Sequence, residues 1–152
     1  MVLKELYPFF QAYAFIIGLA VGSFLNVIIY RLPKNKSIVK PRSKCTGCET
    51  QISWYDNIPV LSYVLLLGKC RNCKASISVR YPLIEFICGL MTVMLLSIYG
   101  ISYEFLVILL FCYMLIAITF IDIDHFIIPN EFIIFGLIVS FFAHAFNFLP
   151  IS

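Results

Sequence analysis

Charged residues are scarce in this 152-residue sequence, at 12% against about 25% in an ordinary soluble domain. Apolar residues reach 62%, and the mean hydropathy is +0.98. So few polar groups cannot cover a water-soluble globule, and a chain this apolar does not stay disordered. Seven glycines and seven prolines, without a repeat, exclude collagen-like and low-complexity chains. The composition predicts a membrane protein with one sizeable loop.

Four runs lack any charged residue and have 25, 18, 17 and 21 residues: Leu6–Tyr30, Phe86–Tyr103, Phe105–Ile121 and Phe132–Ser152. A transmembrane helix needs about 20 apolar residues, with about 17 as the lower limit. Only a helix or a closed barrel satisfies its own backbone in lipid. We therefore predict an all-α polytopic membrane protein with about four transmembrane helices. Lys4 beside Glu5 makes the start nearly neutral, so the first run is expected to remain as a span and not to be a removed signal peptide.

Basic residues are concentrated in one segment. Ten of the 11 Lys and Arg lie from Arg31 to Arg80, with two acids among them, so this segment carries a net charge of +8. Short loops rich in Lys and Arg stay in the cytoplasm. The segment is therefore expected to be cytoplasmic, and Asp122, at the end of the third run, to lie on the same side. No helix suited to reading DNA accompanies the charge, so we expect no nucleic-acid partner.

Two CxxC pairs lie in this basic segment. Cys45 and Cys48 form the first pair, Cys70 and Cys73 the second, and 21 residues separate them. Two such pairs can present four thiolates to one tetrahedral zinc ion, and four sulfurs leave no position open for water or substrate. We therefore predict a structural zinc site. A pair of disulfides is the alternative, which a reducing cytoplasm disfavours.

A second polar cluster borders the third run, at Asp122, Asp124 and His125. Ionisable residues at membrane depth are costly, so they are candidates for function. The alternative is an interfacial turn whose acids cap the next helix. Aspartic peptide hydrolysis needs two neighbouring carboxylates, one as base and one kept protonated. The third aspartate, Asp56, lies in the basic segment, so a second aspartate on another helix is missing.

Smaller features have less specific meanings. Gly18 and Gly22 form a GxxxG pattern that permits close helix packing. Gln11 and Asn26 are expected either to bond between helices or to line a pathway. Glu85 is expected to favour the start of the second apolar helix. Two further cysteines and a histidine, Cys88, Cys112 and His144, have ordinary structural interpretations in or near the spans.

Taken together, the motifs resemble the bacterial prepilin peptidases, the leader peptidase and N-methyltransferase enzymes of type IV pilus, competence and type II secretion systems. The likeness covers the whole chain. It rests on Gly22–Val27, Tyr30–Pro33, Pro41–Cys48, Trp54–Pro59, Gly68–Cys73, Arg80–Glu85 and Ile121–His125 with Pro129–Asn130.

The resemblance implies cleavage of basic leaders from prepilin or pseudopilin substrates at the cytoplasmic face of the bacterial inner membrane. It also implies N-methylation of the new N-terminus with S-adenosylmethionine, for which this sequence has no glycine-rich nucleotide loop. Asp122 takes the place of the first catalytic carboxylate, with Asp124 supporting it. The implied division is a first transmembrane helix over 6–31, a basic zinc-type domain over 32–82 and the first part of an aspartic peptidase membrane domain over 83–152.

One departure affects the expected activity. Family members continue to a Gly-x-Gly-Asp motif that carries the second aspartate, and this sequence has no such motif. The chain is therefore expected to be a fragment of a longer enzyme, or to receive the missing aspartate from a second chain. The alternative function is a non-catalytic membrane module whose basic zinc loop docks acidic lipid or a secretion partner.

Overall fold

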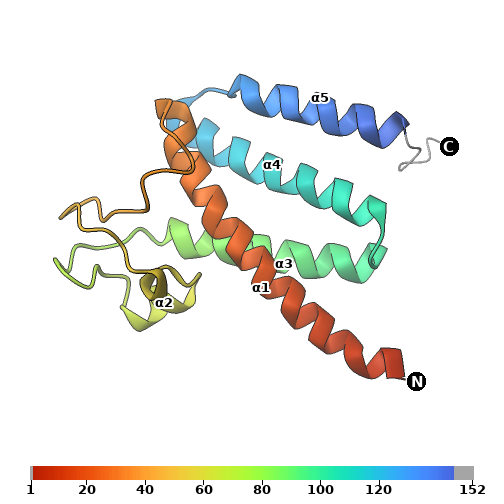
Figure 1. Cartoon of the computed structure of the whole chain (residues 1–152), viewed down its shortest axis with the longest axis horizontal. Coiled ribbons are helices and arrows are strands. Elements are labelled where there is room, and N and C mark those ends of the chain that lie inside the picture. The colour runs from red at the N-terminus through yellow and green to blue at the C-terminus, as the bar shows by residue number, and fades with distance from the viewer. Residues whose placement is uncertain (1, 146–152) are drawn as a thin grey trace.

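The computed structural model describes residues 2–145, which fold into helices and one long irregular segment (Figure 1). The elements are α1 (Val2–Arg31), η1 (Leu32–Lys34), η2 (Trp54–Asn57), α2 (Leu61–Leu65), α3 (Arg80–Tyr99), α4 (Tyr103–His125) and α5 (Asn130–Ala145). Within the described residues, extended pairing is limited to two isolated bridges. The all-α prediction is confirmed.

Among the described residues, three helices are long and apolar enough to cross a membrane: Tyr7–Lys34, Arg80–Tyr99 and Tyr103–His125. The last contains the shortest of the predicted spans, yet the helix has 23 residues because it continues past the uncharged run at both ends. Its start is capped by Ser102, whose hydroxyl accepts the Phe105 N–H at 3.1 Å. At about 1.5 Å per residue, α4 is about 35 Å long, which exceeds a hydrocarbon core of about 30 Å.

The fourth predicted span corresponds to α5, an apolar helix of 16 residues. The predicted run continues to Ser152, and residues 146–152 lie outside the described residues. His144 falls in the last described turn of α5. Phe132, near the start of the helix, packs against the core of the other helices and so attaches α5 to them.

Glycines bring α1 and α3 into close contact. A Cβ atom at Gly18 would lie 2.7 Å from the Cys88 carbonyl oxygen, and one at Gly22 would lie 2.6 Å from the Glu85 Cα. Only glycine permits this separation, so the predicted role of the GxxxG pattern is confirmed. Cys88 is fully buried in this contact, as expected.

Polar side chains add hydrogen bonds between the same two helices. The Gln11 amide donates to the Ser97 hydroxyl at 3.1 Å, and the Asn26 amide donates to the Tyr81 carbonyl at 3.1 Å. Gln11 and Asn26 were expected either to bond between helices or to line a pathway, and in the structure each forms a hydrogen bond between α1 and α3. Asn26 is also buried.

The helices position the irregular segment. Figure 1 shows α3 and α4 running antiparallel, so that the start of α3 and the end of α4 lie at one end of the bundle. Residues 35–79 lie beside that end, where α1 stops and α3 begins (Figure 1). This segment contains all four cysteines of the CxxC pairs.

Candidate metal centre and its neighbouring cavity

The two CxxC pairs form turns of the same construction. In the first turn the Cys45 N–H donates to the Thr50 carbonyl at 2.9 Å, and a bridge joins Lys44 to Gln51. In the second, the Cys70 N–H donates to the Ala75 carbonyl at 2.8 Å, and a bridge joins Lys69 to Ser76. Each turn also has a left-handed residue directly after its second cysteine, at Glu49 (φ 55°) and Lys74 (φ 61°). The repeated geometry points the sulfurs of both turns inward.

The four sulfur atoms of Cys45, Cys48, Cys70 and Cys73 lie within 4.8 Å of one another. Cys45 Sγ is 3.7 Å from Cys73 Sγ, far beyond the disulfide bond length of about 2.05 Å. All four cysteines are free thiols. The alternative of two disulfides is not what the structure has, and the cluster can hold a metal ion.

The thiols differ in acidity. A hydrogen bond with the Thr50 side chain, together with the Thr50 backbone, lowers the pKa of the Cys48 thiol to about 6. Backbone N–H groups of Cys73 and Asn72 lower the pKa of Cys70. The Ala75 N–H favours the Cys73 thiolate, but burial and the neighbouring sulfurs raise the pKa of Cys73 to about 11. Four thiolates this close need a cation, and a bound metal ion would supply it.

An ion pair braces the second turn. The Arg71 guanidinium donates to both oxygens of Asp56, with contacts of 2.7 to 3.1 Å, and it lies over the Tyr55 ring at 5.6 Å. The Arg71 bonds hold the pKa of the Asp56 carboxyl below its usual range. Because Arg71 directly follows Cys70, the bidentate contact fixes the turn against η2.

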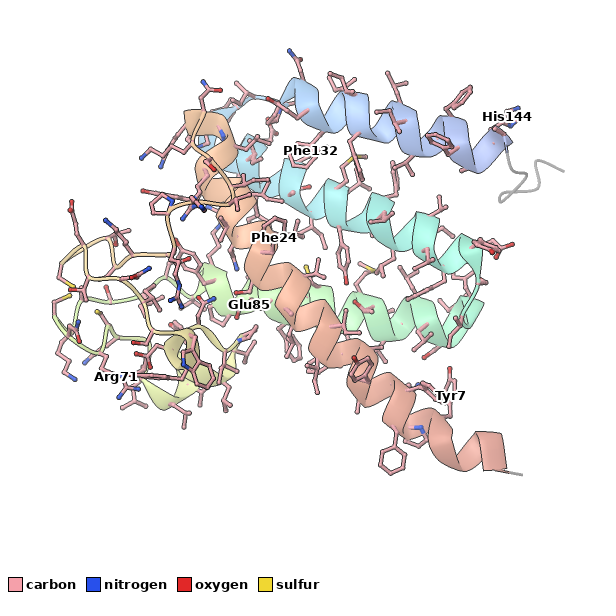
Figure 2. All side chains as sticks on the ribbon, viewed as in Figure 1. Tyr7, Phe24, Arg71, Glu85, Phe132 and His144 are labelled. Atoms are coloured by element: carbon pink, nitrogen blue, oxygen red, sulfur yellow. The ribbon has the colours of Figure 1, made fainter. Side chains whose placement is uncertain are left out.

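A buried carboxylate connects this segment to the membrane helices. Glu85 of α3 is 8% exposed, and its Oε2 accepts the Val60 N–H at 2.7 Å. Val60 has an unusual backbone conformation for a β-branched residue, with φ 59°. Figure 2 shows Glu85 near the start of α3, beside the irregular segment. Its observed contact therefore extends beyond the helix-start role expected from the sequence.

A cavity of about 1000 Å³ lies between the cysteine turns and the membrane helices. Its walls include Cys45 and Cys70 on one side and Asn26, Tyr81 and Glu85 on the other. A volume of this size is in the range of small-molecule sites. The cavity is thus a space that a ligand can occupy next to the metal cluster.

The predicted acidic cluster lies at the end of α4. Asp122 and Asp124 are both in the last turn, exposed, and followed by a left-handed C-cap at Phe126. Arg80, the first residue of α3, donates to Asp124 Oδ2 at 2.5 Å and to the Phe120 carbonyl at 3.1 Å. No ion pair involves Asp122 in the described part of the chain. The two aspartates therefore differ in their contacts: Asp124 forms an ion pair with Arg80, whereas Asp122 forms none among the described residues.

Sequence reasoning missed the Arg80–Asp124 pair and the Glu85–Val60 bond. The sequence contains a signal for the ion pair. Two helices of 20 and 23 residues joined by residues 100–102 run antiparallel with similar lengths, so the start of the first lies beside the end of the second. The sequence contains no signal for the Glu85–Val60 bond, because the contact depends on how residues 35–79 fold back onto α3.

Residues 16–99 match the family model described as Bacterial Peptidase A24 N-terminal domain. The chain belongs to this family. The A24 N-terminal domain match covers the second half of α1, both cysteine turns and all of α3, and it ends before Asp122.

Relatives of this chain include three proteins named Prepilin leader peptidase/N-methyltransferase. Those of Myxococcus xanthus, Pseudomonas putida and Neisseria gonorrhoeae are 44%, 38% and 37% identical over 88%, 89% and 85% of this chain. The matches cover 40%, 56% and 54% of these relatives, so the chain spans about half their length. No solved structure matches the chain.

Proposed function

We propose that this chain is the N-terminal part of a prepilin leader peptidase/N-methyltransferase. The name of its relatives supports this activity. The structural observation that carries the proposal is the Arg80–Asp124 ion pair, because it joins the last residue of the basic segment to the Asp122 motif. The proposed substrates are prepilin or pseudopilin leaders, whose basic character suits an exposed aspartate at the membrane surface.

The proposed location is the bacterial inner membrane, with residues 32–82 in the cytoplasm. The net charge of +8 on the segment from Arg31 to Arg80 supports this orientation. The division into a first span (6–31), a basic metal-binding domain (32–82) and the start of a peptidase membrane domain (83–152) remains part of the proposal. Lipid is accordingly a direct partner of the helices.

The proposed metal is zinc in a structural role. Four sulfurs at about 2.3 Å from a zinc ion lie about 3.8 Å apart, and the Cys45–Cys73 separation of 3.7 Å fits this geometry. Four protein ligands close the coordination sphere, so the metal stabilises the two turns and does not activate water. Cys45, Cys48, Cys70 and Cys73 would be the ligands.

The proposed catalytic carboxylate is Asp122. The Arg80 contact leaves Asp124 as a supporting group, while Asp122 remains available to share a proton with a second carboxylate. That second aspartate would come from the rest of a longer protein or from a second chain. S-adenosylmethionine is the proposed methyl donor, because the relatives' name includes N-methyltransferase.

A chimera tests the peptidase proposal. Residues 1–145 of this chain replace the matching part of the Myxococcus xanthus relative, and the chimera is expressed in membranes with a prepilin-like substrate. We expect leader removal that Asp122→Asn abolishes, that Asp124→Asn reduces and that the control Glu131→Gln leaves unchanged. Leader removal that survives Asp122→Asn would exclude Asp122 from the proposed role.

A second candidate is a non-catalytic membrane module, favoured by the concentration of positive charge in the segment from Arg31 to Arg80. In that case, an inactive chimera would be accompanied by preferential binding of anionic lipid to the purified chain. Cleavage by the chimera that depends on Asp122 would exclude this candidate.

A further inference from the structure

Within residues 2–145, the buried carboxylate of Glu85 has no cationic partner. Its described contacts are neutral: the Val60 N–H at 2.7 Å and the side chain of Ser23. The ion pairs within the described residues are Arg71–Asp56 and Arg80–Asp124, and neither involves Glu85. A carboxylate that is 8% exposed is costly unless it takes up a proton or a positive group neutralises it. Among the described residues, no cation therefore balances a charge on Glu85.

Glu85 also has a distinct position in the cavity. The walls contain three acidic residues: Glu49, Asp56 and Glu85. Glu49 is exposed and Asp56 is bound by Arg71, so Glu85 is the buried acid that a ligand in the cavity can still neutralise. Asn26 lies on the same wall, and its amide donates to the Tyr81 carbonyl. Its carbonyl oxygen can serve as a second acceptor for a ligand.

The geometry points to a site for the primary ammonium group of a peptide N-terminus, with Glu85 as its carboxylate partner. A primary ammonium has three N–H donors and one positive charge, which suit a carboxylate beside neutral acceptors. Apolar residues Val27, Ile58 and Leu66 also line the cavity and suit an apolar first residue.

The charge around the cavity limits which ligands can bind there. Besides Arg71, which pairs with Asp56, the basic residues that line the cavity are Arg31, Lys36, Lys40, Arg42 and Lys44. Several positive charges on one ligand would therefore be repelled there. A peptide whose charge is confined to its α-ammonium meets less repulsion. The identity of this ligand rests on the proposed function, because removal of a leader creates a new α-amine next to the same end of the helix bundle.

Binding to the purified full chain, loaded with zinc in lipid nanodiscs, tests the site. The probes are the peptide Leu-Ala-Ala-Leu-amide with a free α-amine, its N-acetylated form and its N-trimethylated form. Loss of a buried charge pair typically costs enough to weaken binding by more than tenfold. We therefore expect the free amine to bind at least about tenfold more tightly than the acetylated peptide, and the trimethylated peptide, which keeps its charge but has no N–H donor, to bind more weakly than the free amine.

Two variants assign the effect to Glu85. Glu85→Gln keeps an oxygen that can accept the Val60 N–H but removes the charge, and it should abolish the preference for the free amine. Glu49→Gln removes an exposed acid on the same cavity and should retain that preference. Helix content and bound zinc measured on each variant show whether it is folded.

Three results would overturn the site. These are equal binding of free and acetylated peptides by the unsubstituted chain, an unchanged preference in folded Glu85→Gln, and equal loss of the preference in Glu49→Gln. If Glu85→Gln does not fold, the comparison of the three probes on the unsubstituted chain decides alone. Because no step of this assay requires peptide cleavage, its outcome is independent of whether the chimera removes leaders.

Discussion

At the residue scale, single contacts hold the two cysteine turns to the rest of the protein. Arg71 binds Asp56 through two parallel hydrogen bonds, and it does so from the position between Cys70 and Asn72. Residues that orient metal ligands from outside the coordination sphere affect affinity for the metal. The Asp56 carboxylate is therefore expected to matter for metal binding although it touches no sulfur in the cluster.

Asp56→Ala should weaken zinc binding by up to about tenfold, since the second turn loses its brace. Competition with a fluorescent chelator measures the affinity. Arg71 keeps the pKa of Asp56 below its usual value, which is about 3.9. The carboxylate is therefore ionised throughout the range from pH 6 to 8, and the ratio of the two affinities should not change across it. Glu49→Gln is the matched acidic control, and an equal loss there would contradict a specific role for Asp56.

Removal of a cysteine tests the metal centre itself. We expect about one zinc per chain, and loss of that zinc in Cys45→Ser or Cys70→Ser, because three sulfurs no longer complete the tetrahedral set. Metal analysis of protein prepared under reducing conditions measures the content. Cys112→Ser, in α4 and outside the cluster, should retain the zinc. A folded, reduced chain without metal would contradict the assignment.

At the element scale, the decisive contact is between α1 and α3. Its glycines were recognisable from their spacing alone, because a small residue every four positions is what close helix packing needs. The residues at which α4 begins and ends were harder to predict than its existence. The α4 helix includes charged Glu104 and Asp122 beyond the apolar run, since capping and backbone hydrogen bonding extend a helix past its apolar part.

Gly22→Ala should separate α1 from α3, because the new Cβ would lie 2.6 Å from the Glu85 Cα. Overpacking of this kind costs about 1–3 kcal/mol. Reversible unfolding in detergent, followed by helix content, measures the loss of stability. Gly136→Ala is the control, since its Cβ would meet only the flexible end of Met114, at 3.2 Å. Equal stability of the two variants would contradict the tight contact.

At the scale of the whole molecule, composition and charge distribution were enough to predict a helical membrane protein with one basic segment. The cluster of four cysteines was predictable because each CxxC pair is a local motif and two such pairs are typical of a four-cysteine metal site. The cavity and the partner of Glu85 were not, since they depend on the folding of residues 35–79, which contain little regular structure. Asp124 was expected to support Asp122, but its ion pair with Arg80 required the antiparallel arrangement of α3 and α4.

The orientation of the whole chain is testable with reporter fusions. Fusions of green fluorescent protein after Pro41 and after Pro129 should fluoresce, because both positions are expected in the cytoplasm. A fusion after Ile101, in the connection between α3 and α4, should instead be active with alkaline phosphatase, which works only outside the cytoplasm. Phosphatase activity after Pro41 would reverse the proposed orientation.

The join between the second cysteine turn and α3 is short. Only residues 77–79 separate Ser76 from Arg80, and hydrogen bonds from Ile77 to the Gly68 carbonyl and from Tyr81 to the Ser78 carbonyl leave it little slack. We therefore expect a displacement of the cysteine turns to displace the first turn of α3 as well. Because Arg80 in that turn binds Asp124, a movement of the cysteine turns would also change the position of the aspartates at the end of α4.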